Sequence, residues 1–269
     1  MRLLECRPLA EVARHGFTTR ALALGLPDDA AAWAALAATF DLPPASVARL
    51  RQVHGRDVVR ARGPASVASR PAGDALVTDD PSIALAVQAA DCVPLLIADG
   101  RSGAVAAVHA GWRGTAARAA TAAVDALEAD FAARAADLVV AIGPSIGPCC
   151  YQVGPEVRHA FEQVGHRPEA VASWFHPDGG DRLRLDLWRA HVDLLLERGV
   201  PAGSIHTAGL CTAHDAEHFF SYRREGEAAG RLAAVIRATR RGPIDAAAPG
   251  AGSERAARVP VPRGSSTTG

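Results

Sequence analysis

Residues 83–115 read IALAVQAADCVPLLIADGRSGAVAAVHAGWRGT, and this stretch contains three short apolar runs. They are Ile83–Val87, Val93–Ala98 and Ala104–His109, and the turn-like AGWRG closes the last of them. The runs are partly β-branched, and polar or glycine-containing residues separate them. Short apolar runs bounded by turn signals predict buried strands.

Further elements are expected on both sides of this stretch, beginning with a strand-and-turn entry over residues 1–20. The expected strands are Asp74–Thr78, Leu138–Ile142, Ser204–Ala208 and Leu232–Ile236, and the expected helices are Asp28–Phe40, Thr115–Arg134, Pro155–Val164 and Asp186–Arg198. Because strands and helices do not strictly alternate, the pattern predicts an α+β fold with mixed sheets rather than a doubly wound one.

Length and composition exclude several classes of function. The 269 residues suit one large domain or two small ones over 1–241, followed by a Gly/Pro/Ala/Ser/Arg tail over 242–269 that is expected to be disordered. The 29 basic and 29 acidic residues balance, which argues against a nucleic-acid or anionic-membrane partner. The chain contains no lysine, which excludes Schiff-base chemistry, and no dinucleotide or Walker motif is found.

The cysteines and the N-terminal residues predict a cytoplasmic protein. The five cysteines are an odd number, which favours free thiols in a reducing compartment. Charged residues interrupt MRLLECRPLAEVARHG, so it does not resemble a signal peptide, and no apolar run is long enough to span a membrane.

Three residues of metal-ligating type stand beside turns: His54 in RQVHG, Cys92 in AADCVPL and His109 in AVHAGWRGT. Their spacing alone is weak support, because each residue also fits an ordinary buried thiol or a hydrogen-bonded histidine. If they converge, His₂Cys is a zinc ligand set with one position open for water or substrate. Copper fits less well, because its His₂Cys sites usually add an axial methionine and the only methionine is Met1.

Charged residues near these turns are candidates for catalysis and substrate binding. Asp91 or Asp74 could act as a general base or orient a ligand histidine, although turn and cap roles are equally compatible with both. Arg113 in GWRG, and Arg223 and Arg224 in FFSYRREG, could bind phosphate or carboxylate. In a chain whose basic residues are all arginine, surface charge is the alternative for each.

Two other motifs have competing interpretations. His214–His218 reads HDAEH and matches the inverted zinc-protease pattern, but the following FFSYRREG makes a long helix doubtful. Cys149 and Cys150 form a vicinal pair, and two ordinary thiols are expected there because vicinal disulfides are strained.

The motifs together resemble one known family. In order they are QVHG, DALVTD, AADCVPLLIAD, AVHAGWRGT, AIGPSIGPCCYQVGPEV and CT-x5-HFFSYRREG-x3-GR, covering roughly residues 10–240. This set resembles the YfiH-type laccase-domain family, whose members are described as zinc-dependent purine nucleoside phosphorylases. The resemblance implies a layered α/β sandwich related to the cysteine hydrolase fold of cytotoxic necrotising factors. It also implies a zinc ion held by His54, Cys92 and His109.

The resemblance further implies a set of activities and site residues. They are phosphorolysis of adenosine, inosine and methylthioadenosine, adenosine deamination, and editing of peptidoglycan precursors. Cys92, His109 and Asp91 are then the expected catalytic residues. The expected substrate-binding residues are Gln52, Asp74, Arg113, Arg223 and Arg224. Three departures from the family pattern are the loop after Arg20, His191 where relatives often carry Asn, and Ala229 where a Thr is usual.

Three alternatives to a zinc phosphorylase remain open from the sequence. One is a hydrolase that attacks an amide in a cell-wall precursor, with Cys92 as nucleophile and His109 as base. The second is a copper-dependent polyphenol oxidase. The third is a binding domain without turnover, against which the complete set of ligand residues argues.

Overall fold

The computed structural model describes residues 3–22, 24 and 30–239. The expected tail over 242–269, and Asp28 at the start of an expected helix, lie outside the described residues. Within this part of the chain, no helix is long and apolar enough to cross a membrane.

Three sheets are found in the described part of the chain. The six-stranded sheet has the order β12 (Ile205–Thr207), β8 (Leu138–Ile142), β6 (Val93–Asp99), β7 (Val105–Ala110), β4 (Ala75–Thr78), β3 (Val58–Arg60). The four-stranded sheet has the order β1 (Arg14–Phe17), β13 (Leu232–Arg237), β5 (Ala84–Ala89), β2 (Val47–Ala48). A small sheet contains β10 (Phe175–Pro177), β11 (Leu183–Leu185) and β9 (Gln152–Val153). All three expected strands of residues 83–115 are present, and pairing is mixed, with β12–β8, β3–β4 and β2–β5 parallel.

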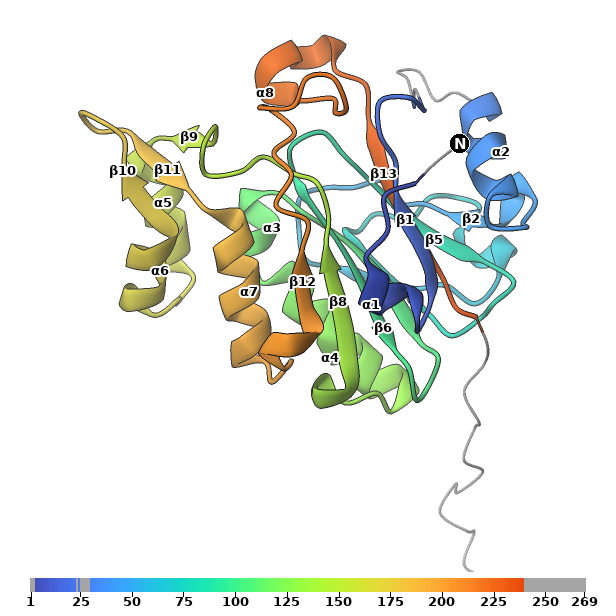
Figure 1. Cartoon of the computed structure of the whole chain (residues 1–269). Helices are drawn as coiled ribbons and strands as arrows, with labels where there is room; N and C mark the ends of the chain where they lie inside the picture. Colours follow the sequence, from blue (N-terminus) through green and yellow to red (C-terminus); the bar gives the residue numbers. More distant parts are fainter. Residues whose placement is uncertain (1–2, 23, 25–29, 240–269) are drawn as a thin grey trace, which may run out of the picture.

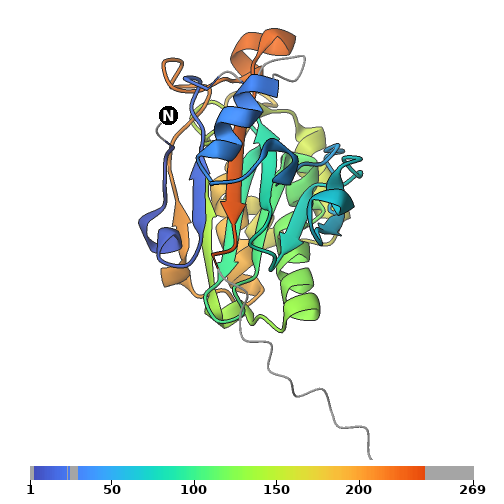
Figure 2. The same cartoon turned by 90° about the vertical axis from the view of Figure 1, so that its right-hand side faces the viewer.

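Helices cover the outer faces of the two large sheets (Figure 1). The α-helices are α1 (Arg7–Ala10), α2 (Ala30–Ala38), α3 (Trp112–Ala116), α4 (Ala119–Phe131), α5 (Pro155–Gln163), α6 (Pro168–Trp174), α7 (Leu187–Glu197) and α8 (Tyr222–Glu225). Short 3-10 turns are η1 (Pro44–Ser46), η2 (Pro64–Val67), η3 (Ala135–Asp137), η4 (Ala202–Ser204) and η5 (Gly226–Ala228). In Figure 2, α2 lies in front of the four-stranded sheet, whose strands run side by side.

Alternating residues of the central strands build the layers of the core. In β6, Val93, Leu95 and Ile97 pack toward α4 and α7, whereas Leu96 and Ala98 pack toward the four-stranded sheet. The four-stranded sheet in turn packs its other face against α2. A strand buried on both faces reads as a continuous apolar run, which is why residues 83–115 show no polar alternation.

The expected helix Thr115–Arg134 is wrong as a single element. Arg118 adopts the left-handed conformation with φ of 64°, so the chain forms α3 and α4 instead, and α3 already begins at Trp112 within the expected turn AGWRG. At the far end, α4 stops at Phe131, because Ala132 is also left-handed with φ of 51°. A non-glycine residue in this region breaks the helical hydrogen-bond ladder. After the bend, α3 packs against α7. The other expected strands and helices are present within a few residues of their expected ends.

Candidate active site and metal centre

Asp74 holds the loop that carries His54. Its carboxylate is fully buried and accepts hydrogen bonds from the backbone N–H groups of Val53 (3.3 Å), His54 (3.0 Å) and Gly55 (2.6 Å). His54 itself is left-handed, with φ of 61°, a conformation that a non-glycine residue adopts only when its surroundings hold it there. The three hydrogen bonds to one carboxylate supply that constraint.

The same carboxylate orients His109, which lies near the end of β7. His109 Nδ1 is 2.9 Å from Asp74 Oδ1, and the His109 backbone N–H donates to the Asp74 carbonyl at 2.8 Å. Because an ionised carboxylate only accepts hydrogen bonds, Nδ1 carries a proton, and Nε2 is the nitrogen that can ligate a metal ion once its own proton is released. A carboxylate behind a histidine is the usual support of a metal-ligating imidazole.

Cys92 completes the group from the turn between β5 and β6. The ligand atoms of His54, Cys92 and His109 all lie within 4.8 Å of one another, and the two imidazole rings meet edge to face with centroids 4.9 Å apart. Gly111 leaves room for them, because a Cβ at that position would be 2.8 Å from Cys92 Sγ and 3.3 Å from His54 Cδ2. The structure therefore brings together the three residues that the sequence suggested.

Electrostatics favour an anionic sulfur beside charged imidazole. Burial raises the pKa of the Cys92 thiol, but hydrogen bonds and charges from His109 and His54 outweigh burial and lower that pKa to about 6. Burial lowers the pKa of His109, but Asp74 and Cys92 outweigh it and raise that pKa to about 9. Asp74 shows the matching change, since His109 and the Gly55 N–H overcome the effect of burial and lower its pKa.

The donor set fits a divalent metal ion. One thiol with a lowered pKa and two imidazoles, one of them with its tautomer fixed by Asp74, are the donor types found in catalytic zinc sites that keep a position open. Their mutual separation is short enough for one ion to reach all three donors.

Asp91 connects this centre to the segment that bears Arg223. Its carboxylate, 8% exposed, accepts hydrogen bonds from Thr212 Oγ1 (2.6 Å), Ser221 Oγ (3.0 Å) and the Arg223 backbone N–H (2.6 Å). Asp91 also has a positive φ of 89°, which is strained for a residue with a side chain. This geometry supports a positioning role for Asp91; the proton-handling role stays a prediction.

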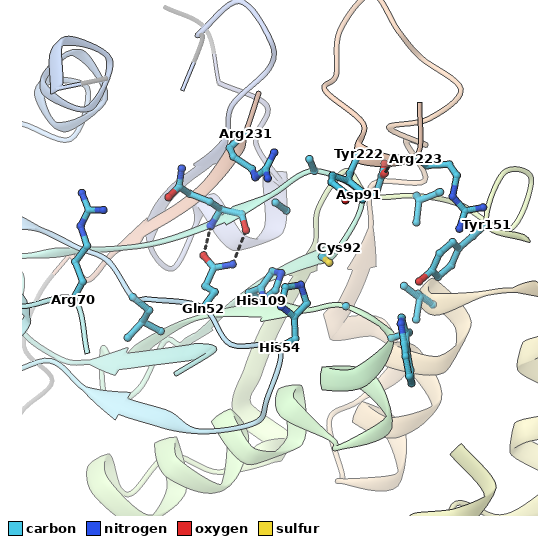
Figure 3. A pocket seen from close by; sticks show the side chains of 18 residues that line it. Gln52, His54, Arg70, Asp91, Cys92, His109, Tyr151, Tyr222, Arg223 and Arg231 are labelled. Carbon is cyan, nitrogen blue, oxygen red and sulfur yellow. Dashed lines mark hydrogen bonds between the residues drawn. The ribbon is translucent and has the colours of Figure 1, made fainter. Parts of the chain in front are cut away.

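A cavity of about 860 Å³ opens over the three candidate ligands (Figure 3). In that view His54, His109 and Cys92 lie centrally, with Arg70 on one side and Arg223 and Tyr151 on the other. The lining residues are Leu50, Gln52, His54, Arg70, Gln88, Ala89, Ala90, Asp91, Cys92, His109, Gly111, Trp112, Ile146, Tyr151, Leu187, Tyr222, Arg223 and Arg231. The size of the cavity and its aromatic, apolar and cationic lining suit a small organic ligand together with an anionic group.

The structure separates the arginines that the sequence proposed together. Arg223 lines the cavity, donates from Nη1 to the Gln152 carbonyl at 2.9 Å and lies 5.3 Å from the Tyr151 ring centre. Arg113 is exposed, stacks on Trp112 at 4.2 Å and is not among the residues that line the cavity. Arg224 is also outside the lining, and its guanidinium binds backbone carbonyls and Glu225.

Gln52 lines the cavity but is engaged with the backbone of β5. Its Nε2 donates to the Gln88 carbonyl at 2.7 Å, and its Oε1 accepts from the Gln88 N–H at 2.8 Å. Both ends of the amide are therefore used to join the His54 loop to β5. Substrate binding by Gln52 stays a prediction.

Several lining residues were not singled out from the sequence. Arg70 and Arg231 add cationic groups, and Trp112, Tyr151 and Tyr222 add aromatic surface. Trp112 stands in AVHAGWRGT, Tyr151 in IGPSIGPCCYQV, and Tyr222 and Arg231 in FFSYRREG-x3-GR. Their positions inside these motifs could have indicated that they lie near the site. Arg70 has no such signal.

The HDAEH segment does not form the helix that an inverted zinc-protease motif needs. Residues 212–218 form turns, and His218 instead contacts Asp215 at 3.0 Å. Cys149 and Cys150 are free thiols, as expected, with their Sγ atoms 3.5 Å apart.

Comparison with known proteins places this mixed α+β fold in a family. Residues 14–239 match the family described as multi-copper polyphenol oxidoreductase laccase. A purine nucleoside phosphorylase of Deinococcus radiodurans is 38% identical over 208 residues, which cover 77% of this chain and 76% of the relative. Another from Bacteroides thetaiotaomicron is 39% identical over 163 residues, covering 61% of this chain and only 60% of that protein's length. The crystal structure of YlmD from Geobacillus stearothermophilus superposes with a TM-score of 0.78 at 31% identity, covering 84% of this chain and 92% of the other.

The chain therefore belongs to this YfiH-type laccase-domain family. The names of its relatives support an enzymatic role.

Proposed function

We propose that this protein is a zinc-dependent purine nucleoside phosphorylase acting on adenosine, inosine and methylthioadenosine. The observation that carries the proposal is the cavity that joins a His₂Cys centre to cationic and aromatic lining residues. The names of the relatives in Deinococcus and Bacteroides agree with it. The working unit is residues 1–241, acting in the cytoplasm, where the five free thiols would remain reduced.

In this reaction the C1′–N9 bond of the nucleoside breaks and a C1′–O bond to phosphate forms. The leaving purine takes up a proton, and the second product is ribose 1-phosphate from adenosine or inosine and 5-methylthioribose 1-phosphate from methylthioadenosine. His54, Cys92 and His109 would hold zinc, which supplies Lewis-acid polarisation of a bound oxygen or nitrogen. The remaining requirement is to hold phosphate against C1′, and the cationic side chains that line the cavity would meet it.

Arg223 is the best placed residue to hold phosphate. Its guanidinium lines the cavity, and its backbone is tied to Asp91, the residue next to Cys92. The Asp91 carboxylate would therefore fix the position of Arg223, and of the phosphate it holds, relative to the candidate metal ligands. Arg231 also lines the cavity and adds positive charge, which stabilises phosphate and the charge that develops in the transition state. Tyr151 and Trp112 offer apolar ring surface for the purine.

Adenosine deamination is proposed as a secondary activity of the same cavity. A zinc ion held by His54, Cys92 and His109 would also supply the activated water that hydrolytic attack on a purine ring needs. Inosine formed from adenosine without phosphate would reveal it.

One observation favours a second candidate function. Cys92, His109 and Asp74 form a thiol–imidazole–carboxylate series, and the lowered pKa of Cys92 suits a nucleophile. We therefore keep amidase-type editing of a peptidoglycan precursor as the alternative, together with a relation to the cysteine hydrolase fold of cytotoxic necrotising factors. Copper-dependent phenol oxidation is weaker, because His₂Cys copper sites usually add an axial methionine and the sequence offers only Met1.

Product analysis distinguishes these candidates. Purified protein with measured zinc content is incubated with adenosine, with and without phosphate, and adenine, inosine and ribose 1-phosphate are quantified. Phosphate-dependent release of adenine in equal amount with ribose 1-phosphate supports the phosphorylase. The phosphorylase proposal is contradicted if zinc-loaded protein releases neither adenine nor ribose 1-phosphate when phosphate is present. Peptidoglycan-precursor peptides are then the next substrates to test.

A further inference from the structure

A second group of three thiols lies away from the candidate active site. Cys149 and Cys150 are in the loop after β8, and Cys211 is in the segment after β12 (Figure 1). The two strands pair in parallel, and the pairing continues beyond them through a bridge between Ser145 and Cys211. Backbone hydrogen bonds specify this contact, because Ser145 N–H donates to Leu210 and Thr212 N–H donates to Ser145, both at 3.1 Å.

The three sulfur atoms converge. They lie within 4.8 Å of one another, and Cys149 Sγ is 3.5 Å from Cys150 Sγ. Cys211 Sγ accepts a hydrogen bond from the Gly147 backbone N–H at 3.2 Å, which fixes that sulfur and favours its anionic form. Cys211 is buried, Cys150 is half-buried and Cys149 is exposed. The group is thus closed on the protein side and open to solvent on the other.

The group is separate from the His₂Cys centre. None of its three cysteines lines the cavity, although the neighbouring Ile146 and Tyr151 do. It contains only thiols, with no imidazole or carboxylate among the described residues grouped with them. It therefore differs in donor chemistry from the His54–Cys92–His109 centre.

We propose that Cys149, Cys150 and Cys211 form a second metal site that binds a thiophilic ion, Cu(I). Sulfur donors select soft ions such as Cu(I), and structural zinc sites are closed by four protein ligands, whereas this group supplies three. Binding replaces S–H bonds with copper–sulfur bonds and releases the thiol protons to solvent, with no change in oxidation state. A vicinal Cys149–Cys150 disulfide would be strained, so metal binding is the favoured chemistry of this pair.

Such an ion would tie together two loops that support the cavity wall. Thr212, next to Cys211, donates to Asp91, while Tyr151, next to Cys150, lines the cavity. Copper bound across the loops would hold both segments in place. This consequence does not depend on which substrate the cavity accepts, so the site can be tested apart from the proposed function.

The test is anaerobic titration of the reduced full chain with Cu(I) in competition with a chromophoric chelator. We expect the wild-type chain and Cys92→Ala to bind about one Cu(I) at the three-thiol group, and Cys149→Ser/Cys150→Ser to bind about one ion fewer than the wild type. Cys6→Ser is the matched control, because Cys6 is a half-buried thiol outside both groups, and it should bind as many ions as the wild type. X-ray absorption of the copper-loaded Cys92→Ala variant should show three sulfur neighbours.

Two results would overturn the proposal. One is an unchanged copper stoichiometry in Cys149→Ser/Cys150→Ser, and the other is a Cys92→Ala variant that binds no copper. If the double variant does not fold, as judged by its melting curve without metal, Cys149→Ser alone replaces it. That exposed side chain can be changed without disturbing the core, and its loss should weaken copper binding by at least about tenfold. An unchanged affinity in the single variant also overturns the proposal.

Discussion

Asp74→Asn is the substitution that most sharply tests how the metal centre is built. The Asp74 carboxylate accepts four hydrogen bonds, two at each oxygen: His54 N–H and His109 Nδ1–H at Oδ1, and Val53 N–H and Gly55 N–H at Oδ2. Asparagine keeps the shape but has a single acceptor oxygen, so two of the four donors lose their partner. The substitution thus changes hydrogen bonding with almost no change in volume.

The expected magnitudes follow from that count. Two donors left without an acceptor at a buried position should lower the free energy of unfolding by about 2–4 kcal/mol. Loss of the group that orients a metal-ligating histidine should weaken zinc binding by about 10–100-fold, equivalent to about 1.4–2.7 kcal/mol. Urea unfolding measures the first quantity, and zinc competition with a chromophoric chelator measures the second.

Asp57→Asn is the matched control, because Asp57 is exposed and contributes only its backbone carbonyl to the neighbouring residues. It should leave both quantities unchanged. Zinc affinity of Asp74→Asn within about threefold of the wild-type value would refute the reasoning, because the carboxylate would then not orient the ligands.

Three further predictions concern the cavity, the metal centre and a buried histidine in α7. Arg223→Ala should raise the KM for phosphate by at least about tenfold, whereas Arg113→Ala, which removes an arginine outside the cavity, should not; equal effects in steady-state kinetics would count against the proposed phosphate site. Gly111→Ala should reduce zinc content while Gly203→Ala, with open space around it, should not; metal analysis showing full occupancy in Gly111→Ala would contradict the close packing at Cys92. Burial lowers the pKa of His191 to about 3, so the unfolded chain takes up a proton below about pH 6.5 that the folded chain does not. Stability should then fall by up to about 1.4 kcal/mol per pH unit between about pH 6.5 and 3, and His191→Asn should flatten that slope in urea unfolding.

The strands of residues 83–115 could be predicted because each is buried on both faces and therefore reads as an unbroken apolar run. The break at Arg118 could not, because a left-handed non-glycine residue in an alanine-rich helical pattern carries no local signal. The small sheet of β9, β10 and β11 was also missed, since strands of two or three residues are specified by pairing between distant segments.

The site shows the same division. His54, Cys92 and His109 could be suspected from residue type, but their convergence depends on Asp74 and on the strained backbone of His54, which are long-range effects. Arg113 and Arg223 were indistinguishable as sequence, because both stand in glycine-containing arginine motifs. Only tertiary packing places Arg223 in the cavity and leaves Arg113 stacked on Trp112 at the surface.

The most direct test of the central claim is the dependence of phosphorolysis on metal at the His54–Cys92–His109 centre. Zinc is removed from the full chain with a chelator and returned stepwise, and adenine release from adenosine with phosphate is measured at each step. The account predicts that turnover rises in proportion to bound zinc up to about one ion per chain, and that Cys92→Ala neither retains zinc nor recovers turnover. Full turnover by the zinc-free chain, or full zinc occupancy in Cys92→Ala, would contradict it.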